Sequence, residues 1–110
     1  MSRYSFLAAG EAGFLGVMLA AMSAHGDPDR ARMIGSGAAL LGWHAPAFLA
    51  WRAWGGATLA PVLWAAGLLL FGGAVLTRAF TGVSLGWTAP SGGILLLAGW
   101  LLVAFAALRR

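Results

Sequence analysis

Cysteine and lysine are absent from this chain of 110 residues, and charged residues make up only 9% of it. The lack of cysteine excludes disulfides, thiolate metal sites and thiol nucleophiles. A typical soluble domain carries about 25% charged residues, so this chain cannot cover a globule with side chains that favour water. Hydrophobic residues reach 61%, and the mean hydropathy is +0.85. The composition therefore excludes a soluble enzyme and a disordered tail, and it predicts a protein surrounded by lipid.

The high isoelectric point does not indicate a nucleic-acid partner. It is about 11.6 because seven arginines outnumber three acidic residues, Glu11, Asp27 and Asp29. The arginines are scattered along the chain rather than gathered on one face, as nucleic-acid binding would require. We therefore expect the lipid bilayer as the main partner and no nucleic acid.

Four apolar segments divide the chain, and each has about the 20 residues that a membrane-spanning helix needs. They cover residues of about 4–24, 33–51, 59–77 and 89–108. The loops between them are short, so neighbouring segments must run antiparallel, and four strands cannot close a barrel in lipid. The sequence predicts an all-α, integral membrane four-helix bundle with up-down topology, forming a single domain. We expect the first segment to be retained rather than cleaved as a signal peptide, because it is long and Glu11 interrupts it.

The distribution of arginine predicts the orientation in the membrane. With both termini on one side, that side carries four arginines (Arg3, Arg52, Arg109 and Arg110), and the opposite side carries three. Arginine is enriched in cytoplasmic segments, so both termini are expected in the cytoplasm. The absence of lysine and the compact loops favour a bacterial inner membrane.

Small residues and tryptophans predict how the helices pack. Ala12, Gly16, Ala20 and Ala24 recur every four residues in the first segment, a spacing that lets helices approach closely in lipid. Among the tryptophans, Trp51, Trp54 and Trp87 are expected at the membrane interfaces, where aromatic residues are enriched. Trp43 and Trp100 are expected deeper, filling gaps between helices.

Glu11 and His44 are the ionisable residues expected at membrane depth, where such groups are costly and usually face the bundle interior or a cavity. Helical rise places Glu11 about 10 Å inside one face and His44 about 15 Å from either face. Their depths differ by about one turn, so neighbouring helices would let them touch. Three interpretations stay open: a structural hydrogen-bonded pair, a proton-exchanging pair, since burial favours a neutral carboxyl, or no contact, with Glu11 meeting a lipid headgroup or another subunit.

The second histidine, His25, raises the possibility of a cofactor or metal. Two histidines can ligate one haem iron only when they face each other at similar depth, and His25 is expected at the interface, about 15 Å from His44 in depth. Only Asp27 and Asp29 accompany His25, which is a poor zinc set. Phosphate-binding loops and nucleophile elbows are missing as well. We therefore expect no metal, no cofactor and no catalytic residue.

Several short motifs resemble a known family of small membrane proteins. They occur in order along the chain as Ala24-His25, Trp43-His44-Ala45, Phe71 with Gly73, Ala89-Pro90-Ser91-Gly92-Gly93 and Gly99-Trp100. On these motifs the chain resembles the domain of unknown function 423 family, which includes YgdD-like inner-membrane proteins of bacteria and transmembrane protein 256 of animals. The resemblance implies a membrane protein without an established activity. It also makes His25, Pro90, Gly92, Gly93 and Trp100 candidate interface residues.

Three functions are compatible with these features. The first is a non-enzymatic accessory or assembly subunit of a membrane complex, which would bind other membrane subunits or a second copy of itself. The second is a small oligomeric transporter or proton-linked channel that uses Glu11 and His44. The third is a haem or quinone binder.

Overall fold

The computed structural model describes residues 2–109, which form four α-helices and no strand. They are α1 (Ser2–Ser23), α2 (Pro28–Trp54), α3 (Leu59–Thr81) and α4 (Thr88–Arg109). Each helix is long and apolar enough to cross a membrane. The predicted all-α fold with four candidate spans is therefore confirmed.

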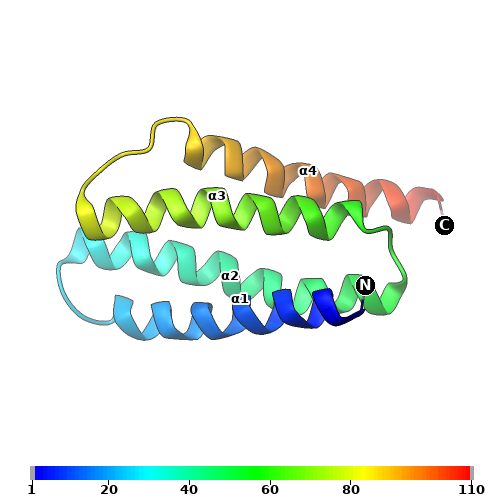
Figure 1. Ribbon diagram of the computed structural model, residues 1–110, viewed down its shortest axis with the longest axis horizontal. Helices are drawn as coiled ribbons and strands as arrows, with labels where there is room; N and C mark the ends of the chain where they lie inside the picture. Colours follow the sequence, from blue (N-terminus) through cyan, green and yellow to red (C-terminus); the bar gives the residue numbers. More distant parts are fainter. Residues whose placement is uncertain (1, 110) are drawn as a thin grey trace.

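Successive helices run in opposite directions and pack in chain order (Figure 1). α1 packs against α2, α2 against α3, and α3 against α4, whereas the outer helices α1 and α4 share no extensive contact. The array is elongated, with extents of 47 × 26 × 20 Å. The bundle is thus open rather than closed around one axis, and this opening leaves grooves between helices that are not neighbours in the chain.

The ends of α2 show why the helix is longer than the predicted second span. The Asp27 carboxylate accepts a hydrogen bond from the Arg30 backbone N–H at 3.1 Å, and Pro28 opens the first turn, a position that needs no amide donor. At the other end Gly55 adopts a left-handed conformation with φ of 81°, which stops the helix. Capping therefore extends α2 past the apolar stretch on both sides.

The buried residues of α1 and α4 recur at alternating intervals of three and four. In α1 they are Ala9, Ala12, Gly16 and Leu19. This spacing averages 3.5 residues and is typical of left-handed helix packing. The predicted four-residue seam is therefore correct at Ala12 and Gly16 and wrong beyond them, because Ala20 is exposed and Leu19 takes the inward position.

The closest helix contact joins α3 to α4 through two glycines. A Cβ atom on Gly92 would lie 2.4 Å from the Phe71 backbone nitrogen, and one on Gly67 would lie 2.8 Å from the Gly92 carbonyl oxygen. Both distances are far shorter than van der Waals contact, so neither position accepts a side chain without moving a helix. Gly92 thus fixes the separation of α3 and α4.

Candidate functional site

His44 lies at the centre of the helix array and is only 2% exposed. Its Nδ1 atom is 2.7 Å from the Leu40 carbonyl oxygen, and its Nε2 atom accepts a hydrogen bond from the Trp100 indole N–H at 3.0 Å. A carbonyl can only accept and an indole N–H can only donate, so the proton of the imidazole must be on Nδ1. This arrangement defines a neutral ring in which both nitrogen atoms are satisfied.

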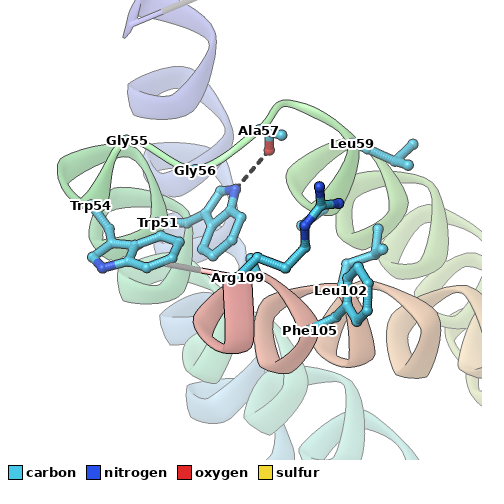
Figure 2. A pocket seen from close by; sticks show the side chains of 11 residues that line it. Trp51, Trp54, Gly55, Gly56, Ala57, Leu59, Leu102, Phe105 and Arg109 are labelled. Carbon is cyan, nitrogen blue, oxygen red and sulfur yellow. Dashed lines mark hydrogen bonds between the residues drawn. The ribbon is translucent and has the colours of Figure 1, made fainter.

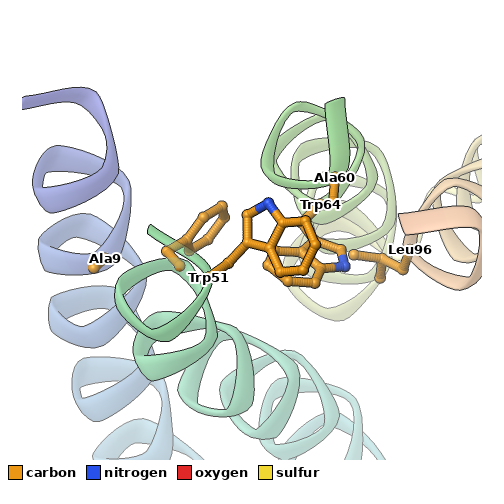
Figure 3. Packing of buried hydrophobic residues seen from close by; sticks show 6 residues of the cluster. Ala9, Trp51, Ala60, Trp64 and Leu96 are labelled. Carbon is orange, nitrogen blue, oxygen red and sulfur yellow. The ribbon is translucent and has the colours of Figure 1, made fainter. Parts of the chain in front are cut away.

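The rings of Trp64 and Trp100 contact this histidine. Trp51 and Trp64 pack near Ala60 and Leu96 in the core where α2, α3 and α4 meet (Figure 3). Six rings are in contact here, and we refer to them together as the aromatic cluster: His44, Phe48, Trp51, Trp54, Trp64 and Trp100. Trp64 is its hub. Its centroid lies 4.6 Å from that of Trp100 and 5.8 Å from those of His44 and Phe48, and the His44 and Phe48 contacts are edge-to-face.

Trp64 was not singled out by the sequence analysis, yet it is 1% exposed and is the largest fully buried side chain. Trp64 can be buried here because the residue of α4 that its indole packs against is a glycine. A Cβ atom on Gly99 would lie 2.7 Å from Trp64 Nε1. The indole N–H has no hydrogen-bond partner within the described part of the chain. Ala60, Trp64 and Gly67 follow one another at intervals of four and three residues, so they lie on one face of α3. This spacing in the sequence could have indicated that Trp64 lies in the core.

The burial of the other tryptophans agrees only in part with the prediction. Trp43 is 68% exposed and points away from the helix array, so its predicted gap-filling role is wrong; it precedes His44 and therefore projects from another side of α2. Trp87 is exposed, as expected for an interface residue. Trp51 lies at the end of α2 but is buried there, and its indole donates to the Ala57 carbonyl oxygen at 2.7 Å.

Glu11 and His44 are close in depth but do not meet. A Cβ atom on Gly13 would lie 3.9 Å from that of Ala45, so these positions oppose each other across the α1–α2 contact. In this register Glu11 lies about one helical turn from the level of His44, as predicted. The two side chains face different ways, however: Glu11 is exposed on the outer side of α1, and His44 is buried on the side of α2 that faces α4.

Glu11 lies on the rim of a groove between α1 and α3, with α2 as its floor. The groove has a volume of about 340 Å³, and its lining includes Ala12, Leu41, Gly72 and Gly73. Within residues 2–109 the Glu11 carboxylate makes no ion pair or hydrogen bond. The polar group expected at membrane depth is therefore presented outward, beside a hollow lined by leucine, phenylalanine, alanine and glycine.

The polar residues between α1 and α2 stabilise the turn. His25 is exposed, and its backbone N–H donates to the Met22 carbonyl oxygen. Asp29 forms an exposed ion pair with Arg32 at 3.1 Å, while Asp27 caps α2. Within the described residues no three potential metal ligands of the His, Cys, Asp or Glu type come together.

The motif residues of the fourth helix have separate positions. Pro90 lies in the first turn of α4, Gly92 packs against α3, and a Cβ atom on Gly93 would meet nothing within 4 Å. Trp100 reaches His44. The structure therefore joins two motifs that are 56 residues apart, Trp43-His44-Ala45 and Gly99-Trp100, through one hydrogen bond.

Comparison with known proteins found no protein-family model, no curated protein and no solved structure that matches this chain. The resemblance to the domain of unknown function 423 family therefore stays a prediction from the motifs. What the chain offers chemically is a satisfied neutral histidine in an aromatic core and one unpaired carboxylate on the outer surface.

Proposed function

We propose that this protein is a non-enzymatic integral membrane protein that acts as an accessory or assembly subunit of a membrane complex. The observation that carries the proposal is the outward-facing, unpaired Glu11 on the groove between α1 and α3. The proposed host is the bacterial inner membrane, with both termini in the cytoplasm, as the distribution of arginine favours.

An acidic side chain that faces hydrocarbon is costly. Insertion scales assign about 2.5–3.5 kcal/mol to a charged residue at the centre of a spanning helix. Intramembrane carboxyls are usually relieved by a partner group, and no residue from 2 to 109 supplies one to Glu11. A helix from another subunit that presents a hydrogen-bond donor or a basic side chain at this depth would remove the penalty.

The shape of the groove also favours a helix as its occupant. A Cβ atom on Gly72 or Gly73 would meet nothing within 4 Å, so this stretch of α3 presents bare backbone to the groove. Small residues of this kind let helices approach closely in lipid. A second hollow of about 140 Å³, which shares Ala8 and Ala65 with the groove, continues it toward the membrane interface.

A different subunit fits this face better than a second copy does. All seven arginines lie near the ends of the predicted spans, away from the depth of Glu11. The histidine closest to that depth, His44, is buried and has both nitrogens engaged. A second copy could therefore offer Glu11 no basic side chain at this depth, only neutral donors such as the exposed Trp43 indole, whereas an unrelated helix is free to carry a basic residue.

The proposal is tested by native mass spectrometry after gentle extraction from the source membranes. We expect the wild type to travel with a partner subunit in fixed stoichiometry, and both Glu11→Leu and the groove-filling Gly73→Leu to release it. The matched control is Gly93→Leu, a glycine on α4 that also has open space around its Cβ position. The proposal fails if the wild type appears as a bare monomer or homo-oligomer, or if the control releases the partner equally.

No observation in the structure favours the two other functions. A proton relay through Glu11 and His44 requires contact between them, and the side chains face different directions. Haem ligation by His44 would require its Nε2 lone pair, which already accepts the hydrogen bond from Trp100.

A further inference from the structure

The end of the molecule where α2 and α4 terminate carries two hollows on the side away from the Glu11 groove. The first, at the tip, has a volume of about 380 Å³ and is bounded by the α2–α3 loop and the last turn of α4 (Figure 2). The second has a volume of about 390 Å³ and runs between α2 and α4 over Trp64 and Trp100. Trp51 and Trp54 line both hollows, which are therefore adjacent.

Apart from one residue, the walls of these hollows are apolar. The exception is Arg109, whose guanidinium extends over the tip hollow toward Leu59 (Figure 2). Its Cζ atom lies 5.6 Å from the centre of the Phe105 ring, and among residues 2–109 it pairs with no carboxylate. Arg109, for which the described residues supply no counter-ion, thus stands at the mouth of an aromatic and aliphatic slot.

The charge at this end of the molecule favours an anion. Arg3 and Arg52 belong to the same end as Arg109, and no acidic residue does. At the opposite end, Asp27 and Asp29 accompany the arginines. An anionic group in the headgroup layer would therefore be attracted to this end and would meet Arg109 next to the apolar slot.

We propose that these two hollows form a binding site for an anionic phospholipid, with the phosphate on Arg109 and one acyl chain along the groove between α2 and α4. Both volumes lie within the roughly 300–1,000 Å³ range of small-molecule sites. The groove extends from Ala107 to Trp100, which is about 10 Å of helical rise and matches part of an acyl chain. Arginine is well suited to the phosphate because its planar fork can form two parallel hydrogen bonds.

The walls of the site are held in place before any lipid arrives. The Trp51 indole is fixed by its hydrogen bond to Ala57, and the loop packs so closely against its ring that a Cβ atom on Gly56 would overlap the indole. Trp64 is fixed by burial. A rigid slot loses little conformational freedom on binding, which favours affinity.

The test measures lipid preference by native mass spectrometry of the intact protein in micelles. The probes are dioleoyl phosphatidylglycerol and dioleoyl phosphatidylcholine at equal concentration, which differ only in the headgroup. We expect the wild type to retain the anionic lipid preferentially, and Arg109→Gln to lower that preference about tenfold, the size expected for loss of a charge-assisted hydrogen bond. The control is Arg78→Gln, because Arg78 is also an exposed arginine in the last turn of a helix, but at the opposite end.

A second pair of variants tests the acyl groove separately. Ala107→Phe fills the groove between α2 and α4, whereas Ala104→Phe adds the same ring to an exposed position that lines neither hollow. We expect only Ala107→Phe to reduce retention of the anionic lipid. The proposal is overturned by equal retention of the two lipids by the wild type, by equal effects of Arg109→Gln and Arg78→Gln, or by equal effects of the two phenylalanine variants. Partner loss through the Glu11 groove is a different readout, so the two proposals fail independently.

Discussion

The hydrogen bond between Trp100 and His44 allows a quantitative test of the core. Replacing Trp100 by phenylalanine keeps an aromatic ring next to Trp64 but removes the only donor that residues 2–109 supply to His44 Nε2. With Trp100 in place His44 is 2% exposed, and the variant leaves its Nε2 acceptor in an aromatic core without that donor. In soluble cores an unsatisfied buried acceptor costs about 1–3 kcal/mol, whereas interhelical hydrogen bonds in membrane proteins average about 0.6 and reach about 1.7 kcal/mol.

Because His44 is buried, we expect the free energy of its hydrogen bond with Trp100 to lie in the upper half of the range found for interhelical hydrogen bonds in membrane proteins. We expect a coupling free energy of about 1–1.5 kcal/mol between the two residues, measured by a double-mutant cycle with His44→Leu, Trp100→Phe and the double variant. The assay is reversible unfolding in mixed detergent micelles, followed by tryptophan fluorescence. The cycle separates the hydrogen bond from the ring packing that Trp100→Phe also changes, which a single variant cannot do.

Trp43→Phe is the matched control, because Trp43 adjoins His44 in sequence but is exposed to the surroundings. We expect it to change the free energy of unfolding by less than about 0.5 kcal/mol, as is usual for surface positions. Nitrogen-15 NMR of His44 provides an independent check, since the hydrogen-bond geometry requires the proton on Nδ1. A coupling below about 0.3 kcal/mol, within the error of such cycles, or a proton on Nε2 would refute the assignment of this bond.

Two further predictions concern helix packing and capping. Gly92→Ala should lower the free energy of unfolding by about 2–3 kcal/mol, as overpacking does, because its Cβ would lie 2.4 Å from the Phe71 backbone nitrogen. Gly93→Ala, with open space, should be neutral or stabilising by up to about 1 kcal/mol, and equal losses in thermal unfolding would contradict the close-approach argument. Asp27→Ala should cost about 1 kcal/mol through loss of the cap on the Arg30 amide, whereas Asp27→Asn should retain most of the stability because asparagine caps equally well; a stable alanine variant would show that this cap is dispensable.

The helices could be predicted from the sequence because lipid imposes length and apolarity on every span. Their ends were less predictable, since caps rather than apolarity determine where the hydrogen bonding stops. Asp27 starts α2 five residues before the predicted span, and Gly82, with φ of 77°, ends α3 four residues after it. Each of these helix ends is determined by a single residue, Asp27 as an N-cap and Gly82 through its left-handed backbone conformation.

The faces of the helices were harder to predict than their positions. In α1 and α2 apolarity is almost uniform around the helix, because the exposed side is as apolar as the buried side. The usual signal of an inward face is therefore missing. For this reason the relative level of Glu11 and His44 along the helices could be predicted from their positions, whereas the directions of their side chains stayed open.

Glu11 and His44, the two ionisable residues expected at membrane depth, have opposite surroundings. His44 is satisfied within the chain, by one carbonyl and one indole, and it contributes to the cohesion of α2, α3 and α4. Glu11 is unsatisfied within the described chain and lies on the open side of α1. A carboxyl needed only for stability would gain from facing the interior, as the histidine does. Its position on the rim of a groove instead makes Glu11, rather than His44, the residue whose replacement should change what this protein binds.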